Sequence, residues 1–482
     1  MTRGVLFTDL YQMTMAQVYF RYGIADHQAS FEHYFRSYPR YGDHRAGYCV
    51  SAGLGALLDR LATFRIGESE LAALASMRSG SGGALFQKDF LNWLGDHGDF
   101  GGLLIQATPD GRVVHPNTPI AAVRGPLVLG QLLETVLLNH RNFATLIATK
   151  AARLKQAAQS GTVLEFGMRR SAGMGANLAT EAALVGGADY SSNVGASHKA
   201  GLPAKGTHAH SLVQAFMALG ESELEAFRAF ARIYPDDCVL LVDTVDTLQS
   251  GLPNAIRVFE ELRRKGHRPV GIRLDSGDPA SLAVEAARML DGAGFEDAAI
   301  VLSDRLDELA IARITDHLAR KAEDPQRQIG RLVYGVGTRL VTSHGSPSLD
   351  GVYKLTAIRQ DRKWRPAFKL TDDVAKSALP GRKSLWRHHR PDGTAAGDLV
   401  TLVDEEPTHQ PSGSYEHLLQ EVWGTGGRLT PAESIEAARQ RRREDVSRLR
   451  QEHLDLLEPA PYPVLLSQGV RAMRDRAFKA TR

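Results

Sequence analysis

The chain has 482 residues, enough for two or three domains with a large buried core. Its 58 Lys and Arg nearly balance its 55 Asp and Glu, so the net charge of +3 gives no reason to expect nucleic acid or an anionic membrane as a partner. Two cysteines, Cys49 and Cys238, exclude a disulfide framework, and the apolar runs are too short to span a membrane. We therefore expect a cytoplasmic protein.

The N-terminal part predicts an α+β domain over residues 1–130. A helix is expected over residues 10–22, because apolar residues recur there at helical spacing. Residues 111–126 are β-like, with turn signals at Asp110-Gly111 and Pro116-Asn117. The composition of this part differs from that of the segment that follows it.

The middle of the chain, residues 131–358, predicts a βα-barrel domain. Short β-branched apolar runs alternate there with helix-length amphipathic stretches, which is typical of a parallel sheet. Seven runs are expected to be strands: 162–166, 188–193, 204–207, 238–242, 269–274, 299–302 and 332–336. Several of them end in polar residues, and in βα barrels the active site lies at the C-terminal ends of the strands.

Residues 359–482 are expected to form a loop-rich and helical segment that packs back on the other two domains. The sequence TPAE at 430–433 resembles a capping box and predicts a helix from there to about residue 457. The basic run at 441–443 is interpreted as a solvated helical face.

The usual nucleotide-binding motifs are missing. The chain contains no G-x-x-x-x-G-K-[ST] phosphate loop and no G-x-G-x-x-G fingerprint in a strand-to-helix setting. A better anion signal is GVGT at 335–338, where two glycines permit close backbone approach and Thr338 adds a hydroxyl donor.

Arg273 is the most informative single residue. It lies within an apolar run, with Asp275 two residues further on, so both should face the same side of the sheet. A guanidinium in such a strand should meet a carboxylate or a phosphate. Asp275 as an internal partner and a bound anionic ligand both remain open, and we favour the ligand.

His208 and His210 leave two enzyme classes open. In a barrel metallohydrolase both imidazoles would bind zinc, which requires a strand that continues through them. Further histidines at later strand ends are also required, but His267 precedes its strand and His317 lies in a helical stretch. Alternatively, one histidine acts as a nucleophile toward a phosphoryl group, and the other is a structural residue, for which His208 is the candidate.

Seven stretches, in order from residue 8, resemble the nicotinate phosphoribosyltransferase family. They are TDLYQMTM (8–15), EFGMRR (165–170), Ser192-Asn193, GTHAHS (206–211), LVDT (241–244), GIRLDSGD (271–278) and GVGTRL (335–340). The resemblance implies an α/β fold, an irregular βα barrel of the type II phosphoribosyltransferase kind with an additional α+β domain. It ends near residue 360, the stretch around Met174-Gly175 departs from the common pattern, and the C-terminal cysteines of some members are missing.

The resemblance also implies a reaction. Nicotinate and 5-phosphoribosyl 1-diphosphate would condense to nicotinate mononucleotide and diphosphate in NAD salvage, with ATP as co-substrate, Mg²⁺ as cofactor and a homodimer that shares its active sites. The chain itself is assigned no metal ligands. A metal-dependent hydrolase using His208 and His210, and a non-catalytic binding relative, remain the alternatives.

The resemblance assigns roles to individual residues. Tyr11 resembles the ring-stacking tyrosine, Thr207 and Arg273 the nicotinate contacts, His210 the phosphorylated histidine and Thr338 a phosphoribosyl diphosphate contact. Arg169, at the end of the first run of the barrel, is also expected to bind substrate. An aromatic face and a guanidinium suit a planar pyridine carboxylate.

Overall fold

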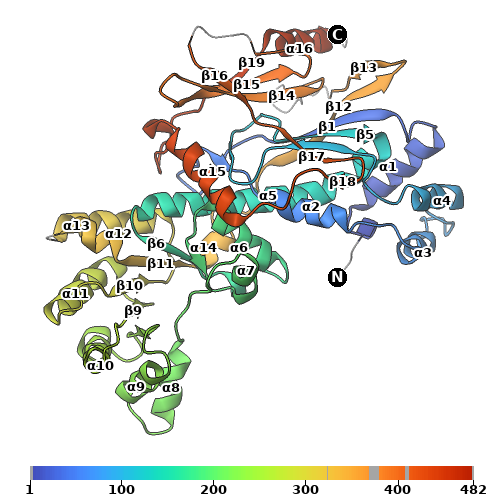
Figure 1. Cartoon of the computed structure of the whole chain (residues 1–482). Coiled ribbons are helices and arrows are strands. Elements are labelled where there is room, and N and C mark those ends of the chain that lie inside the picture. Colours follow the sequence, from blue (N-terminus) through green and yellow to red (C-terminus); the bar gives the residue numbers. More distant parts are fainter. Residues whose placement is uncertain (1–3, 323, 369–378, 408–411, 480–482) are drawn as a thin grey trace. The chain divides into compact units, whose positions relative to one another are not determined.

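The protein is described by a computed structural model that covers residues 4–322, 324–368, 379–407 and 412–479 (Figure 1). The chain forms two compact units. The first contains Met1–Leu146 and Ser348–Arg482, and the second contains Ile147–Pro347. The expected domains 1–130, 131–358 and 359–482 divide the chain differently, because here the N- and C-terminal segments share one unit.

An antiparallel seven-stranded sheet is the framework of the first unit. Its strand order is β13-β12-β1-β5-β3-β17-β18. The strands are β1 (Gln28–Phe35), β3 (Leu104–Ala107), β5 (Ala121–Pro126), β12 (Gly351–Gln360), β13 (Lys363–Pro366), β17 (Gln420–Gly424) and β18 (Gly427–Arg428). A separate pair joins β2 (Cys49–Val50) to β4 (Val113–Val114). The β-like stretch predicted at 111–126 is thus confirmed as β4 and β5.

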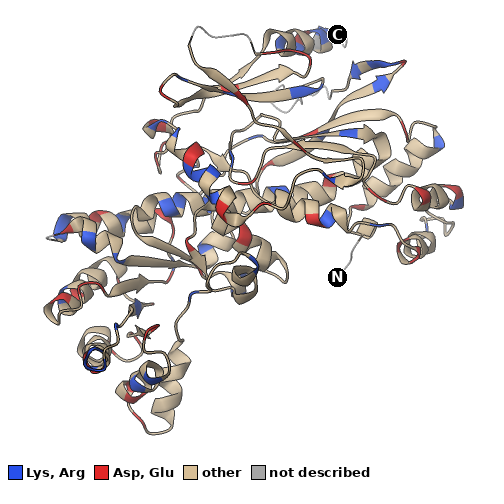
Figure 2. Ribbon diagram, viewed as in Figure 1, with Lys and Arg blue, Asp and Glu red and all other residues tan. Residues whose placement is uncertain are grey.

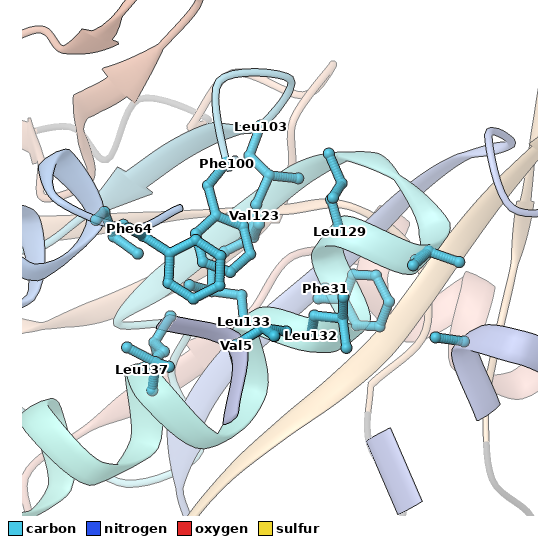
Figure 3. Packing of buried hydrophobic residues seen from close by; sticks show 14 of the residues in the cluster. Val5, Phe31, Phe64, Phe100, Leu103, Val123, Leu129, Leu132, Leu133 and Leu137 are labelled. Carbon is cyan, nitrogen blue, oxygen red and sulfur yellow. The ribbon is translucent and has the colours of Figure 1, made fainter. Parts of the chain in front are cut away.

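The main apolar core of the first unit lies between this sheet and its helices (Figure 3). Phe31 and Val123 come from neighbouring strands, Leu133 comes from α5, and the rings of Phe64 and Phe100 lie 4.3 Å apart. Each such side chain contributes about 1.5–3 kcal/mol by leaving water. The helices are α1 (Leu10–Arg21), α2 (Leu54–Ala62), α3 (Glu68–Ser76), α4 (Lys88–Asp96) and the start of α5 (Leu127–Ala158). The helix predicted over 10–22 is confirmed by α1.

A second sheet in the first unit corrects the expectation of a loop-rich C-terminal segment. It has the order β16-β14-β15-β19. Its strands are β14 (Lys383–His389), β15 (Ala395–Leu402), β16 (Ser414–His417) and β19 (Val464–Leu466). No hydrophobic alternation marks β14 in the sequence, because its buried positions include the charged or polar Lys383, Arg387 and His389.

The helix predicted from the TPAE stretch begins later than expected and is shorter. It is α15 (Ile435–Ser447), and its N-cap is Ser434, whose side chain accepts from the N–H of Ala437 at 3.2 Å. α16 (Gln468–Lys479) follows β19. Two short 3₁₀ turns, Gly4–Leu6 and Gln451–His453, complete the described helical segments of this unit.

A buried ion network ties α15 to the second sheet. Arg387 donates from Nε and Nη2 to the two oxygens of Asp398, at 2.9 and 3.0 Å. Asp445 on α15 accepts from Nη1 of Arg387 at 3.1 Å and from Nη1 of Arg112 at 2.9 Å. All four side chains are buried. Charges in such a network are stable only while every partner is present.

The second unit contains a six-stranded parallel sheet in the order β7-β6-β11-β10-β9-β8. The strands are β6 (Thr162–Glu165), β7 (Tyr190–Ser191), β8 (Val239–Leu241), β9 (Gly271–Leu274), β10 (Ala299–Leu302) and β11 (Leu332–Val336). Six of the seven predicted runs are thus strands. Their β-branched apolar residues are buried apart from the half-buried Val333, as expected for a parallel sheet covered on both faces.

The seventh run, 204–207, is not a strand, and that expectation is wrong. The segment makes one sheet-like bond, from the N–H of Lys205 to the carbonyl of Ser191 at 2.9 Å. Pro203 lacks a backbone donor and Gly206 weakens a strand, so the segment crosses between β7 and β8 without joining a ladder. The barrel is therefore open at this position.

Helices connect the parallel strands. They are α6 (Gly175–Gly186), α7 (Val194–Lys199), α8 (His210–Ala218), α9 (Glu223–Ile233), α10 (Leu252–Arg264), α11 (Pro279–Gly292), α12 (Glu308–Lys321), α13 (Pro325–Gly330) and α14 (Thr338–Val341), with a 3₁₀ turn at Met168–Arg170 and a π-helical turn at Thr247–Gly251. Figure 2 shows Lys and Arg interspersed with Asp and Glu along α11 and α12. Among the described residues, no helix combines the length and the apolar character needed to cross a membrane.

Candidate active site

Polar side chains gather at the C-terminal edge of the parallel sheet. All six strands run in the same direction, so their carboxyl ends lie along one edge. Asp243 follows β8, Asp275 follows β9 and Ser303 follows β10. These three residues are joined by hydrogen bonds. Such an edge is where ligands bind in parallel α/β proteins.

Arg273 is the basic centre of this edge. Its side chain is 13% exposed, and Nη2 lies 3.1 Å from Oδ1 of Asp275. Nε donates to the hydroxyl of Ser303 at 3.1 Å, and Nη1 lies 3.5 Å from the hydroxyl of Thr207. The guanidinium also lies 5.5 Å from the centre of the Phe166 ring. The internal pair with Asp275, one of the two alternatives that the sequence left open, is therefore present, and Thr207 and an aromatic ring lie beside the same guanidinium.

Two carboxylates line the site beside Arg273. The Asp243 side chain is 1% exposed, and its Oδ2 accepts from the N–H of Asp275 at 3.0 Å and from the hydroxyl of Ser276 at 2.5 Å. Its other oxygen, Oδ1, is buried and accepts no hydrogen bond within the described part of the chain. Asp275 accepts from the hydroxyl of Ser303.

The donor set suits Mg²⁺ bound together with a phosphorylated ligand. Mg²⁺ is commonly held by one or two carboxylates and by substrate phosphates, and the unused oxygen of Asp243 beside Asp275 fits this requirement. The described residues contain no group of three or more His, Cys, Asp or Glu that could hold a metal by themselves.

His210 faces these carboxylates. It is the first residue of α8, and its side chain is 36% exposed. Nδ1 lies 3.1 Å from the hydroxyl of Thr244. Nε2 lies 3.7 Å from Oδ2 of Asp275 and 4.0 Å from Oδ1 of Asp243. The imidazole is thus within reach of solvent and of the acidic side of the site.

His208 has a different environment. Its Nε2 accepts from the N–H of Leu241 in β8 at 3.1 Å, and its ring lies 5.0 Å from that of Phe230. Burial lowers its pKa, which favours the unprotonated Nε2 that accepts this hydrogen bond. The zinc hypothesis required a strand that continues through His208 and His210, and this condition is not met, because the segment is not a strand. A two-histidine zinc site is therefore disfavoured, since one ring nitrogen of His208 is committed to the backbone.

The end of β6 presents Arg169. Glu165 is fully buried, and its carboxylate accepts from the N–H of Gly167 and from the hydroxyls of Thr180 and Ser191, the latter two at 2.9 and 2.6 Å. These bonds fix the turn that leads into the 3₁₀ segment Met168–Arg170, where Arg169 is exposed. The buried carboxylate therefore shapes the turn, and Arg169 is available to a ligand.

The end of β11 carries Thr338. A Cβ atom on Gly335 would lie 2.6 Å from the Phe166 ring, so a glycine is required there by close packing. The carbonyl of Val336 accepts from the N–H of Phe166 at 2.9 Å. Thr338 itself begins α14 and is exposed.

The turn between β10 and α12 is strained. Asp304 and Arg305 are consecutive non-glycine residues with φ of 82° and 49°, and both are exposed. Each left-handed residue of this kind costs about 1–2 kcal/mol. Strained backbone persists where the surroundings hold it, and it clusters at functional sites.

Tyr11 is the one predicted site residue that belongs to the first unit. It lies on α1 and is 47% exposed, and burial together with the nearby Glu134 raises its pKa to about 12. Its role as a substrate contact stays a prediction.

Sequence reasoning assigned no role to Thr244 or Phe166. Both occur within the stretches that resemble the family, LVDT and EFGMRR, and both lie at strand ends. Asp243, Asp275 and Ser303 are polar residues at the ends of expected strands, but their mutual contacts come from neighbouring strands and cannot be read from one segment.

Comparison with known proteins gives a consistent result. Three family models match: the nicotinate phosphoribosyltransferase N-terminal domain over residues 6–142, the nicotinate phosphoribosyltransferase family over 162–384 and the C-terminal domain over 408–474. A Bacillus subtilis nicotinate phosphoribosyltransferase is 40% identical over 84% of this chain and 77% of its own length. The human enzyme is 33% identical over 97% and 95%. The C-terminal match extends beyond residue 360, where the sequence alone gave little resemblance.

Solved structures agree. The crystal structure of human nicotinic acid phosphoribosyltransferase has a TM-score of 0.81, 31% identity and coverage of 97% of this chain and 99% of its own. A nicotinate-nucleotide pyrophosphorylase from Pyrococcus furiosus, 20% identical over 92% and 95%, has a TM-score of 0.68 and shares the fold. The predicted fold class, an irregular βα barrel of the type II phosphoribosyltransferase kind with an additional α+β domain, is confirmed. The chain belongs to the nicotinate phosphoribosyltransferase family.

Proposed function

We propose that the C-terminal edge of the parallel sheet in the second unit is the site at which this enzyme joins nicotinate to 5-phosphoribosyl 1-diphosphate. The products are nicotinate mononucleotide and diphosphate, and the reaction serves NAD salvage. The observation that carries the proposal is the convergence of Arg273, Thr207 and Phe166 beside Asp243, Asp275 and His210.

The nicotinate subsite is proposed around Arg273. The guanidinium supplies a charge-assisted pair to the pyridine carboxylate, and Thr207 supplies a hydroxyl next to it. The ring of Phe166 lies against the guanidinium and offers an apolar face to the pyridine. Tyr11 of a neighbouring subunit is proposed to stack on the opposite face of the pyridine.

The phosphoribosyl diphosphate subsite is proposed between the ends of β6 and β11. Arg169 and Thr338 are exposed there and supply a cation and a hydroxyl donor. Asp243 and Asp275 would hold Mg²⁺, which neutralises the charge that develops on the departing diphosphate. The residues of the two subsites would then orient the ribose carbon that carries the diphosphate toward the pyridine nitrogen.

ATP coupling is proposed to proceed through His210. The two carboxylates on the Nε2 side favour a proton on Nε2, which leaves the lone pair on Nδ1, where the Thr244 hydroxyl can donate. Once the Thr244 hydroxyl turns away from Nδ1, this nitrogen would attack the γ-phosphorus of ATP as ADP departs, and the Nε2 proton would pass to a neighbouring carboxylate. Water would later release phosphate from the imidazole. The added negative charge beside Asp275 would change how the site holds the diphosphate.

A homodimer with shared active sites is proposed as the working assembly. Large apolar side chains are exposed on α1 of the first unit, at Leu10, Tyr11 and Val18. Exposed apolar side chains of this kind are typical of an interface. The cytoplasmic location expected from the cysteine content stays a prediction.

The test is a product assay with labelled nicotinate and phosphoribosyl diphosphate, with and without ATP. We expect labelled nicotinate mononucleotide in both cases, with more product at equilibrium when ATP is present. A protein that binds both substrates without forming the nucleotide would be the non-catalytic relative. Stoichiometric zinc together with hydrolytic activity would instead identify a metallohydrolase.

A further inference from the structure

We infer that Arg339 and Asp307 form a positioning pair. The pair holds the turn from β11 into α14, called here the Thr338 turn, against the neighbouring turn between β10 and α12, and it thereby sets the affinity for phosphoribosyl diphosphate. The inference rests on the proposed function. Neither residue is placed in contact with a substrate, so both would act through the turns that they join.

Asp307 has a fixed orientation. It is the N-cap of α12, and its Oδ1 accepts from the N–H of Ala310 at 2.8 Å. The other oxygen, Oδ2, pairs with Nη1 of Arg339. Because the helix end binds one carboxylate oxygen, the orientation of the carboxylate is fixed, and this sets the position of the second oxygen, which pairs with the guanidinium.

The start of α12 is itself anchored below the surface. Glu308, the next residue, is fully buried between two cations of α5 within the second unit. Its carboxylate lies 2.6 Å from Nζ of Lys150 and 3.1 Å from Nε of Arg153. A buried ion triad resists displacement because each charge would otherwise be left without a partner. Asp307 therefore provides a stable support for Arg339.

The opposite side of the Thr338 turn packs on β6. A Cβ atom on Gly337 would lie 3.2 Å from the carbonyl oxygen of Phe166, and the carbonyl of Val336 accepts from the N–H of that residue. The turn is thus held by backbone contacts on one side and by the Arg339–Asp307 pair on the other. Without the ion pair, the Thr338 turn keeps its backbone contacts with Phe166 and loses only its attachment to the start of α12.

The same pair supports the strained residues between β10 and α12. Asp304 and Arg305 lie between two anchors, Ser303 and Asp307. Ser303 is bonded to Arg273, on the nicotinate side, and does not depend on Arg339. Loss of the pair should therefore disturb the phosphoribosyl diphosphate side and leave the nicotinate contact in place.

The experiment compares five variants of the full chain, four single changes and one double change. Arg339→Gln and Asp307→Asn each remove one charge, and asparagine retains the N-cap function. Arg339→Lys keeps the cation. Arg327→Gln is the matched control: Arg327, on α13, also forms an ion pair, with Asp291 at 2.9 Å, but it precedes β11 and does not belong to either of the two turns. Steady-state kinetics give KM for both substrates, and calorimetric titration of phosphoribosyl diphosphate with Mg²⁺, without nicotinate, gives its affinity.

We expect Arg339→Gln and Asp307→Asn each to raise the KM and Kd for phosphoribosyl diphosphate about tenfold, with the nicotinate KM changed less than about twofold. Arg339→Lys should recover most of the affinity. Combining Arg339→Gln with Asp307→Asn should add nothing beyond either single change, since both remove the same interaction. Arg327→Gln should behave as the parent protein.

The inference is overturned if Arg339→Gln leaves the Kd for phosphoribosyl diphosphate unchanged, or if it raises the KM for both substrates equally. It is also overturned if the effects of Arg339→Gln and Asp307→Asn are additive. A general loss of folding would appear as a lowered Tm and equal weakening of both substrates. Suppose that the parent protein binds phosphoribosyl diphosphate, that Arg339→Gln weakens this binding as expected, and that the parent makes no nucleotide. The proposed function then fails and the positioning role stands. If the parent binds none, both fail.

Discussion

Exchanging His208 and His210 separately for asparagine tests whether the two histidines have different tasks. In His208→Asn the N–H of Leu241 loses its acceptor inside the protein, which costs about 1–3 kcal/mol. The ring contact with Phe230 contributes roughly another 0.5–1.5 kcal/mol. The sum, about 1.5–4.5 kcal/mol, corresponds to a Tm of the second unit lowered by roughly 3–18 °C.

His210→Asn should show the reverse pattern. Its side chain is 36% exposed, and its neighbours are polar, so the free energy of unfolding should change by less than about 0.5 kcal/mol. Loss of the imidazole should abolish ATP hydrolysis and acid-labile phosphate on the protein, while slow ATP-independent nucleotide synthesis continues. His208→Asn should retain ATP coupling at temperatures where it is folded.

The assay combines thermal unfolding with incubation in γ-labelled ATP, followed by acid treatment of the isolated protein. Acid-labile label that persists in His210→Asn would show that another residue accepts the phosphoryl group. A His208→Asn protein that is as stable as the parent and yet uncoupled would refute the structural role of His208. Either result would contradict the division of tasks derived from the geometry.

Four further outcomes are expected. Arg273→Gln should lower kcat/KM for nicotinate by roughly 30- to 1000-fold, the loss of about 2–4 kcal/mol of charge-assisted bonding, and should affect phosphoribosyl diphosphate much less; steady-state kinetics with an unchanged nicotinate KM and kcat/KM would show that the assignment is wrong. Inactive Tyr11→Ala and inactive Arg273→Ala proteins should regain some activity after subunit exchange if the active site is shared, and verified hybrids without activity would count against sharing. Asp445→Ala should lower the free energy of unfolding by about 3–5 kcal/mol in urea titrations, because Arg387 loses a buried partner; a change below about 1 kcal/mol would contradict this. Burial lowers the pKa of His33 from the usual value near 6.5 to about 3, so on acidification the unfolded chain takes up a proton before the folded one. The free energy of unfolding should therefore fall as the pH drops below about 6.5, by about 2 kcal/mol at pH 5 from this residue alone. A His33→Gln protein that loses as much stability as the parent between pH 7 and pH 5 would exclude this origin.

Local patterns determined the parallel strands of the second unit. Runs such as 299–302 and 332–336 are apolar and β-branched, and that property belongs to the segment itself because both faces of the strand are buried. The shared face of Arg273 and Asp275 also followed from sequence, since side chains two positions apart at a strand end lie on the same side, whereas the choice between an internal pair and a bound ligand did not. The resemblance to the family rested on stretches of this local kind.

Other features were decided only by the tertiary structure. The buried positions of β14 include Lys383 and Arg387, whose partners are distant in sequence, so no hydrophobic alternation marks the strand. His208 and His210 are equivalent by spacing, and the N–H of Leu241, 33 residues away from His208, distinguishes them. The left-handed Asp304 lies between Ser303, which contacts Arg273, and Asp307, which pairs with Arg339, and both partners come from other segments. In each case the controlling energy is a contact between segments far apart in the chain, and a pattern within one segment carries no information about it.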